Sequence, residues 1–319
     1  MDEFEIIRRY FVPDSSSEDV VIGIGDDGAV LRPDASRDLV TVIDTLVAGV
    51  HFPQKMRPQD IAYRAVAVNV SDIAAMGARP RWMTCAITLT NSSEEWLAGF
   101  SEGLRLAAKE YQVELVGGDT TRGSECVVTV QITGDVAKGM ALTRSGAQPG
   151  DSIFVSGTPG DAACGLSLLQ DKLREDGDSD SDNYLIRRFT NPNARVELGL
   201  KLSGIASAAI DVSDGLYADL EKLLQMSAAG GSIELLDIPL SGALRDENSL
   251  EDSIALALGG GDDYELCFTA PPAAIDVSVS LAGIPIARIG EVNATPGLFC
   301  TQDGNPINYH DKGYRHFSE

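Results

Sequence analysis

A formal net charge of −23 over 319 residues argues against a nucleic-acid partner, because binding a phosphate backbone requires clustered Lys and Arg. A hydrophobic share of 44% is typical of a globular chain, and this length allows two domains. Five scattered cysteines without C-x-x-C spacing, an acidic start and no membrane-length apolar run predict a cytoplasmic protein with no membrane partner.

Apolar strands alternate with helical patterns along the first half of the chain. The expected elements are strand 38–43, helix 58–76, strand 82–89, a helix that a capping box at 92–95 opens and that runs to about 111, strand 113–116 and strand 126–136. The strand at 113–116 is expected to end in a turn at 117–119. Such glycine-rich turns let backbone N–H groups face an anion.

A turn near Gln148 marks the expected domain boundary, which divides the chain into 1–148 and 149–319. The elements expected beyond it are helix 161–173, helix 194–202, strand 208–210, a helix with Ser213 as its N-cap, strand 264–269 and a hairpin turn at 303–305. An apolar strand followed by glycines and one or two aspartates occurs in both halves of the chain. Two related α+β domains would produce such a recurrence.

The most informative feature is a set of aspartates placed where glycine-rich segments meet short apolar strands. They lie in Gly25-Asp26-Asp27-Gly28, Ile43-Asp44-Thr45, Ser71-Asp72-Ile73, Gly117-Gly118-Asp119 and Asp211-Val212-Ser213-Asp214-Gly215. Carboxylates in apolar surroundings need a cation partner. Magnesium takes oxygen ligands and often pairs a few carboxylates with substrate phosphates. The pattern therefore predicts a site for metal-bound phosphate.

Several of these aspartates also have a structural explanation when they are taken singly. Asp27 lies in a turn of the kind that Asp commonly stabilises, and Asp44 can cap the end of its strand. Asp72 is the most informative, because it shares a helical face with Asn69 among small apolar residues. The nearest basic residue before it, Arg64, lies about two helical turns away, which favours a cation as its partner.

Phosphate binding here has to proceed without a lysine-bearing loop, since the pattern G-x-x-x-x-G-K-[ST] is missing from the sequence. Arg144 is the best phosphate clamp, because a guanidinium can bind two oxygens at once. The segment 157–161 ahead of a helix is a weaker candidate for seating phosphate, with an ordinary strand–helix loop as the alternative.

In order, the motifs resemble the thiamine-monophosphate kinase family over about residues 4–317. They are GIGDDGAVL, DTLVAGVHF, NVSDIAAMGARP, LVGGDTTRG, ALTRSGAQPGD, AIDVSDGL and GGDDYELCF. The resemblance implies a two-domain α+β fold of the aminoimidazole ribonucleotide synthetase-like kind. Residues 1–148 would bind ATP and magnesium and pair their sheet with a second subunit into a barrel, making a homodimer. Residues 149–319 would form an α+β domain that completes the active site.

The same resemblance implies ATP-dependent phosphorylation of thiamine monophosphate to thiamine diphosphate, by direct in-line transfer assisted by several Mg²⁺ ions and without a protein nucleophile. The implied metal ligands are Asp27, Asp44, Asp72, Asp119, Asp211 and Asp214. The implied ATP contacts are Tyr111, Gly118, Asp119, Arg144 and Ser213. The implied substrate contacts are His51, Asp262 and Asp311.

Three positions depart from the family pattern. Ile43 replaces a hydroxyl residue before the aspartate of the D-T-L motif, Asp262 replaces a glutamate, and Asp311 replaces an aromatic residue. Tyr309, His310 or Tyr314 would then have to stack on the thiamine. The alternative functions are an ATP-dependent synthetase of the same fold and a non-catalytic metal or nucleotide sensor. Selenophosphate synthesis is disfavoured because no cysteine precedes Cys85.

Overall fold

The computed structural model describes residues 3–13, 16–90, 93–174 and 183–309. The chain divides into two compact units, residues 1–73 with 78–139 and residues 74–77 with 140–319. Among the described residues, no helix combines the length and the apolar character needed to cross a membrane.

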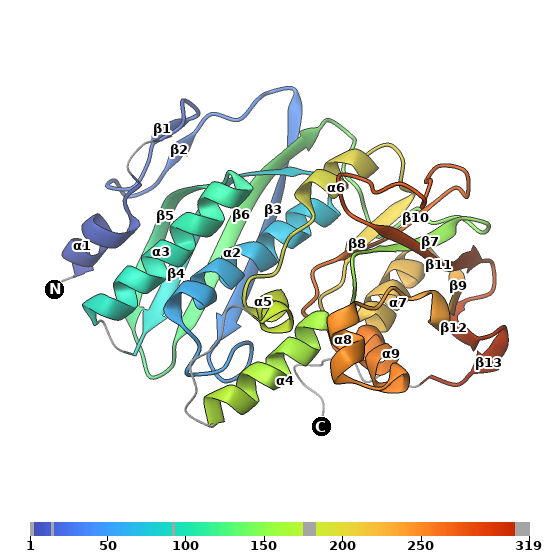
Figure 1. The fold of residues 1–319 in the computed structure, drawn as a ribbon. Coiled ribbons are helices and arrows are strands. Elements are labelled where there is room, and N and C mark those ends of the chain that lie inside the picture. Colours follow the sequence, from blue (N-terminus) through green and yellow to red (C-terminus); the bar gives the residue numbers. More distant parts are fainter. Residues whose placement is uncertain (1–2, 14–15, 91–92, 175–182, 310–319) are drawn as a thin grey trace. The chain divides into compact units, whose positions relative to one another are not determined.

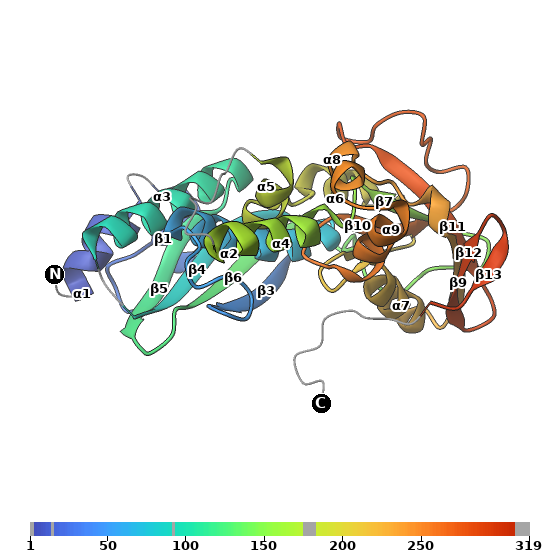
Figure 2. The same ribbon diagram turned by 60° about the horizontal axis from the view of Figure 1, so that its bottom comes forward.

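The first unit contains a four-stranded sheet in the order β3-β6-β4-β5, with α2 and α3 on one of its faces (Figure 1, Figure 2). Its elements are α1 (Glu3–Ile6), the π-helix η1 (Ile7–Phe11), β1 (Val20–Ile22), β2 (Val30–Leu31), β3 (Arg37–Val47), α2 (Pro58–Ala75), β4 (Arg79–Leu89), α3 (Glu94–Tyr111), β5 (Glu114–Arg122) and β6 (Val127–Ala137). Strand β6 is antiparallel to both neighbours, whereas β4 and β5 are parallel.

Small side chains let the two helices of this unit pack closely. Helix α3 begins where the Ser93 side chain accepts the N–H of Trp96, so the predicted start of a helix at 92–95 is confirmed. The cap is Ser93 alone rather than a capping box, because Trp96 stands where a capping box needs Glu or Gln. A Cβ on Gly103 of α3 would lie only 2.0 Å from the Gln59 carbonyl oxygen of α2, so glycine is required at this crossing. Helix α2 is buried along most of its length, which places its polar residues in apolar surroundings.

The second unit contains a seven-stranded sheet in the order β13-β12-β9-β11-β7-β10-β8. Its strands are β7 (Ser152–Ser156), β8 (Ala208–Asp211), β9 (Gly230–Glu234), β10 (Leu266–Ala270), β11 (Ile286–Asn293), β12 (Gly297–Gln302) and β13 (Asn305–Ile307). Its helices are α4 (Asp161–Arg174), α5 (Tyr184–Thr190), α6 (Val196–Leu202), α7 (Leu216–Met226), the 3-10 helix η2 (Leu235–Asp237), α8 (Gly242–Glu247) and α9 (Leu250–Gly259).

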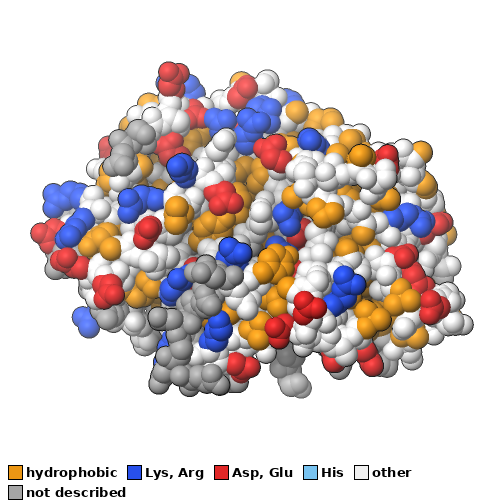
Figure 3. All heavy atoms as spheres, in the orientation of Figure 1, with side chains coloured by type: hydrophobic (Ala, Val, Ile, Leu, Met, Phe, Trp, Pro, Cys, Tyr) orange, Lys and Arg blue, Asp and Glu red, His pale blue; other side chains and the backbone are white. Residues whose placement is uncertain are grey.

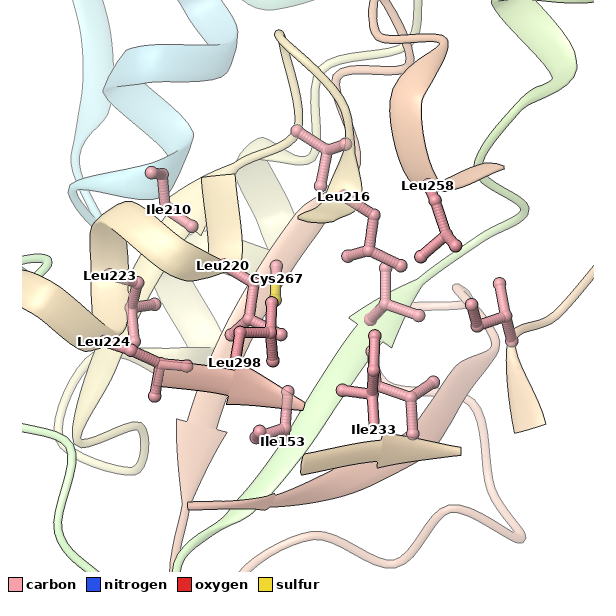
Figure 4. Close-up of a cluster of buried hydrophobic side chains, with 14 of the residues drawn as sticks. Ile153, Ile210, Leu216, Leu220, Leu223, Leu224, Ile233, Leu258, Cys267 and Leu298 are labelled. Atoms are coloured by element: carbon pink, nitrogen blue, oxygen red, sulfur yellow. The ribbon is translucent and has the colours of Figure 1, made fainter. Parts of the chain in front are cut away.

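The main core of the second unit lies between this sheet and α7. Figure 4 shows Leu220, Leu223 and Leu224 of α7 beside Ile153 of β7 and Ile210 of β8. Because β8 ends at Asp211 directly beyond this core, the following loop is anchored by buried apolar side chains.

The expected α+β fold is confirmed, and most elements lie within a few residues of their predicted ranges. The hairpin turn is also confirmed, since Gln302 pairs with Asn305 across Asp303 and Gly304, both with positive φ. Two local predictions are wrong. Residues 117–119 lie inside β5 rather than in a turn, because they continue its pairing with β4. Ser213 is not an N-cap: α7 starts later, with Gly215 at that position and no side-chain cap.

Candidate functional site

A cavity of about 850 Å³ in the first unit brings together two of the aspartate motifs. It is lined by the glycine-rich segment 23–28 and by residues 115–120 of β5, so Asp27, Gly118 and Asp119 border the same space. Both aspartates are exposed to solvent. The sequence placed these three residues in two separate motifs, and the structure brings them to one cavity. A site that binds phosphate through metal ions requires such a grouping.

Within this glycine-rich segment, the two adjacent aspartates have different roles. The Asp26 carboxylate accepts the N–H of Asp27 at 2.8 Å, which is ordinary turn chemistry. The Asp27 carboxylate makes no hydrogen bond to any residue that the structure describes, so it can serve as a ligand. Residues 23–28 also match the spacing G-x-G-x-x-G, but they join β1 to β2. The dinucleotide fingerprint needs a strand followed by a helix, so this match is coincidental.

Gly118 is required where it stands because β5 passes very close to β4. A Cβ at this position would lie 2.1 Å from the carbonyl oxygen of Cys85. The sequence signal of two consecutive glycines was therefore informative, but its cause is close strand pairing rather than turn geometry. The bare backbone of Gly118 borders the cavity, where a bulky anion can approach it.

Asp44 of β3 and Asp72 of α2 are hydrogen-bonded to each other through their side chains. Burial raises the pKa of Asp44 above its ordinary value, although the Asp72 hydrogen bond and the charge of His51 act in the opposite direction. Two carboxylates in contact must share a proton or face a cation. This pair therefore fits a divalent ion, which would neutralise both.

His51 lies in the loop after β3 and is oriented by the backbone. Its Nδ1 accepts the N–H of Val47 at 3.0 Å, so in the neutral imidazole Nε2 carries the proton and can donate to a ligand. The proximity of His51 to Asp44, implied by its effect on the pKa of that carboxyl, supports the prediction that both serve one site.

Strand register relates the Asp44 pair to the cavity. Asp44 pairs with Val130, Val130 with Cys85, and Cys85 with Gly118. Asp44 and Gly118 thus lie on one row across the sheet, three strand spacings or about 14 Å apart. A polyphosphate with bound metal ions could extend over such a distance.

In the second unit, two motifs pack against each other through their backbones. The N–H of Asp262 donates to the Ser213 carbonyl at 2.8 Å, and the N–H of Tyr264 donates to the Val212 carbonyl at 2.9 Å. Asp262 has a φ of 61°, a left-handed conformation held by these contacts, and its carboxylate accepts the Tyr264 hydroxyl at 3.1 Å. Asp211 is buried at the end of β8 beside them.

Two residues of this region were not predicted from the sequence. The Asp219 carboxylate accepts the N–H groups of Ser213 and Asp214 at 2.8 and 2.9 Å and so holds their loop in place. The Lys222 ammonium contacts Asp214 at 2.5 Å and Asp219 at 2.8 Å. Asp219 could have been found from the sequence, because an acidic residue in the first turn of a helix commonly interacts with the N–H groups at the helix start. Lys222 shows that the Asp214 carboxylate already attracts a cation.

A buried ionic network supports the loop that carries Asp262. Glu265 is fully buried and receives hydrogen bonds from Arg188 at 2.8 Å, from Arg195 at 2.7 Å and from the Ser156 hydroxyl. Burial would raise the pKa of Glu265, but the two guanidiniums hold it below its ordinary value. The network also includes Asp161, which faces Arg188.

The segment 157–161 is an ordinary strand–helix loop, the alternative given above, and does not seat phosphate because a carboxylate already accepts its N–H groups. Asp263 accepts the N–H of Gly160 at 2.7 Å and that of Ala162 at 3.2 Å, at the start of α4. These are the groups that would otherwise face an anion at a helix N-terminus. The N–H groups at the start of α4 therefore hold Asp263, the neighbour of Asp262, in place.

The titration of Asp263 gives a testable pH dependence. Burial raises its pKa from 3.8 to about 8, although the Arg188 guanidinium lowers it. Between these values the folded state keeps a proton that the unfolded state has lost, so the free energy of unfolding falls as pH rises. We expect the difference in free energy of unfolding between the wild type and Asp263→Asn to shrink by about 3 kcal/mol between pH 5.5 and 8. Urea unfolding followed by circular dichroism measures this, and a difference constant with pH contradicts it.

The other predicted residues have less defined surroundings. Tyr111 is buried at the end of α3, with its hydroxyl 3.2 Å from that of Tyr63. Arg144 is exposed on the second unit. Asp311, His310 and Tyr314 lie outside the described residues, whereas the Tyr309 ring packs on Tyr217 at 4.8 Å between centroids.

Protein side chains alone do not complete a metal site in the part of the chain described. No group of three or more His, Cys, Asp or Glu residues there converges around a possible ion position. Magnesium commonly uses one or two carboxylates and takes its other oxygens from water and phosphate. The Asp44–Asp72 pair matches that mode of binding.

Comparisons with known proteins agree with the motifs. Residues 25–136 match the family model of AIR synthase related protein, N-terminal domain. The chain is 46% identical to thiamine-monophosphate kinase of Escherichia coli K12 over 321 residues, covering 99% of this chain and 98% of that protein.

Two solved structures are similar over nearly their full length. Thiamine-monophosphate kinase from Stenotrophomonas maltophilia K279a has a TM-score of 0.82 at 43% identity, covering 91% of this chain and 93% of that one. AaThiL complexed with AMPPCP and TMP has a TM-score of 0.79 at 33% identity, covering 92% of each chain. From its sequence and its fold together, this chain belongs to the thiamine-monophosphate kinase family.

Proposed function

We propose that this protein transfers the γ-phosphoryl group of ATP to thiamine monophosphate, with magnesium, to give thiamine diphosphate. The observation that carries this proposal is the contact of Asp44 with Asp72, near His51. Family membership adds the substrate, because the similar proteins are thiamine-monophosphate kinases and AaThiL is complexed with AMPPCP and TMP.

Under this proposal the aspartates hold magnesium and the other residues orient the two phosphorylated substrates. The metal ligands are Asp27, Asp44, Asp72, Asp119, Asp211 and Asp214. Tyr111, Gly118, Asp119, Arg144 and Ser213 contact ATP, and His51, Asp262 and Asp311 contact thiamine monophosphate. Magnesium, when bound, neutralises phosphate charge and lets two anions approach.

Direct in-line transfer follows from the composition of the site. Phosphoryl transfer depends mainly on positioning and on charge neutralisation, so no protein nucleophile is required. The bare backbone of Gly118 would let phosphate approach, and the fork of Arg144 would bind phosphate oxygens. The proton on Nε2 of His51 would donate to the acceptor substrate. The proposed domain boundary at 148/149 separates the first four metal ligands from Asp211 and Asp214.

We further propose that the protein is a cytoplasmic homodimer. Strand β3 is 11 residues long and, among the described strands, pairs only with β6. Its exposed residues include Leu39 and Ile43, at 50% and 65% exposure. A long apolar edge strand of this kind favours pairing with a second copy. The five free cysteines are consistent with a reducing compartment.

The decisive assay separates the kinase from a non-catalytic metal or nucleotide sensor. We expect ADP release from ATP to require thiamine monophosphate and magnesium together, measured by a coupled spectrophotometric assay. Thiamine without its phosphate serves as the control acceptor. ATP binding without ADP release under these conditions would favour the sensor and contradict the kinase.

A further inference from the structure

A second cavity in the first unit is lined mainly by charged side chains. It has a volume of about 530 Å³ and lies where β3 and β4 begin and β6 ends. Four arginines line it, Arg32, Arg37, Arg79 and Arg81, and we call it the arginine cavity. In a chain of formal charge −23, so many arginines at one place require an explanation.

The acidic residues of the arginine cavity are already engaged. Asp135 is ion-paired with Arg37 and lies 3.6 Å from Arg81, and Asp19 is ion-paired with Arg81. The Asp34 carboxylate accepts the N–H and the hydroxyl of Ser36, which hold its pKa below the ordinary value. These pairings fix two of the arginines in position.

The other two arginines have no acidic partner among the described residues. Arg32 and Arg79 are both exposed and border the same hollow. In Figure 3, blue Lys and Arg side chains gather beside red ones near the upper margin, where Figure 1 places the segment joining β2 to β3. Two unpaired guanidiniums therefore lie beside two that ion pairs hold in place, and all four are planar donors.

We propose that the arginine cavity binds a small polyanion that carries a diphosphate group. The guanidinium fork matches phosphate oxygens, and charge-assisted bonds of this kind are the strong ones. One phosphate would leave much of the volume unused, whereas two linked phosphates can engage Arg32 and Arg79 together. A nucleotide and an inorganic diphosphate share this chemistry.

The arginine cavity is separate from the cavity that borders Asp119. Arg79 and Ala86 are both on β4, and Ala86 pairs with Asp119 of β5. Seven residues of extended strand place Arg79 about 23 Å from the row of Asp119, and the two cavities share no lining residue. The inference therefore does not depend on the kinase proposal, and a ligand here leaves the proposed catalytic residues accessible.

The test is calorimetric titration of the full protein with pyrophosphate in EDTA, which removes the metal ions that the kinase site would need. We expect binding that weakens as salt is added and is at least about tenfold weaker in the double variant Arg32→Gln, Arg79→Gln. Titration with ADP in parallel distinguishes the two kinds of ligand. Tighter binding of ADP than of pyrophosphate identifies a nucleotide as the ligand, and weaker binding of ADP identifies an inorganic diphosphate.

The matched control is the double variant Arg187→Gln, Arg245→Gln. These arginines are also exposed and also lack an acidic partner among the described residues, but they lie on α5 and α8. The control changes net charge by the same amount and should bind pyrophosphate like the wild type. No binding to the wild type, or equal loss in both double variants, would overturn the proposal. A melting temperature unchanged in both variants shows that folding is intact.

Discussion

Replacing Asp72 with Asn should lower turnover by about 10²–10³-fold, because metal-ion stabilisation contributes several kcal/mol to such reactions. The change is nearly isosteric, and an Asn side chain can still donate a hydrogen bond to Asp44. Folding should therefore be preserved while one of the two partly buried carboxylates is lost. Magnesium affinity falls for the same reason, so a higher magnesium concentration is needed for half-maximal rate.

The measurement is a magnesium titration of steady-state rate at saturating ATP and acceptor. Asp246→Asn is the control, since Asp246 is exposed on α8 and no contact of its side chain is recorded among the described residues. An Asp72→Asn protein with wild-type turnover and an unchanged magnesium dependence would remove Asp72 from the metal ligands. It would also leave the contact with Asp44 without a functional explanation.

Replacing Arg188 with Leu should destabilise the second unit by about 3–5 kcal/mol, because it leaves buried carboxylates without their cation. Arg188 is 8% exposed and lies 2.8 Å from Glu265 and 3.7 Å from Asp161. Arg195 would remain as a partner of Glu265, but Asp161 would lose its only recorded cation in the described chain. The loss corresponds to a fall in melting temperature of roughly 10 °C.

Arg187→Leu provides the control within the same helix. Arg187 is exposed on α5, one residue from Arg188, and has the same intrinsic helix preference. We expect its melting temperature to change by less than about 2 °C. Equal melting temperatures for the two variants would show that the buried network contributes little to stability. Differential scanning calorimetry of both proteins decides the question.

The sequence predicted the elements and the candidate residues because both depend on local pattern. Asp72 was identified from its helical surroundings alone, and the structure gives it a carboxylate neighbour. Asp27 and Asp119 were identified from glycine-rich segments, and both border one cavity. For Asp72 the local context favoured a cation, whereas the ligand roles of Asp27 and Asp119 depended on the ordered set of family motifs, because each turn taken singly had a structural explanation.

The features that escaped prediction depend on contacts between distant positions. Glu265 meets Ser156, and Asp263 meets Gly160, across more than 100 residues of chain. No periodicity or motif encodes such a pairing. The role of Gly118 likewise depends on parallel register with β4, which a single sequence does not specify. Strand register and buried charge networks are therefore the features that the sequence alone could not predict.

The central claim is that phosphate passes directly from ATP to thiamine monophosphate at a magnesium site formed by aspartates. The most direct test follows label from [γ-³²P]ATP into product, with and without EDTA. We predict label in the terminal phosphate of thiamine diphosphate, only when magnesium is present, and no labelled protein at any time. Label on the protein, or transfer that continues in EDTA, would contradict the claim.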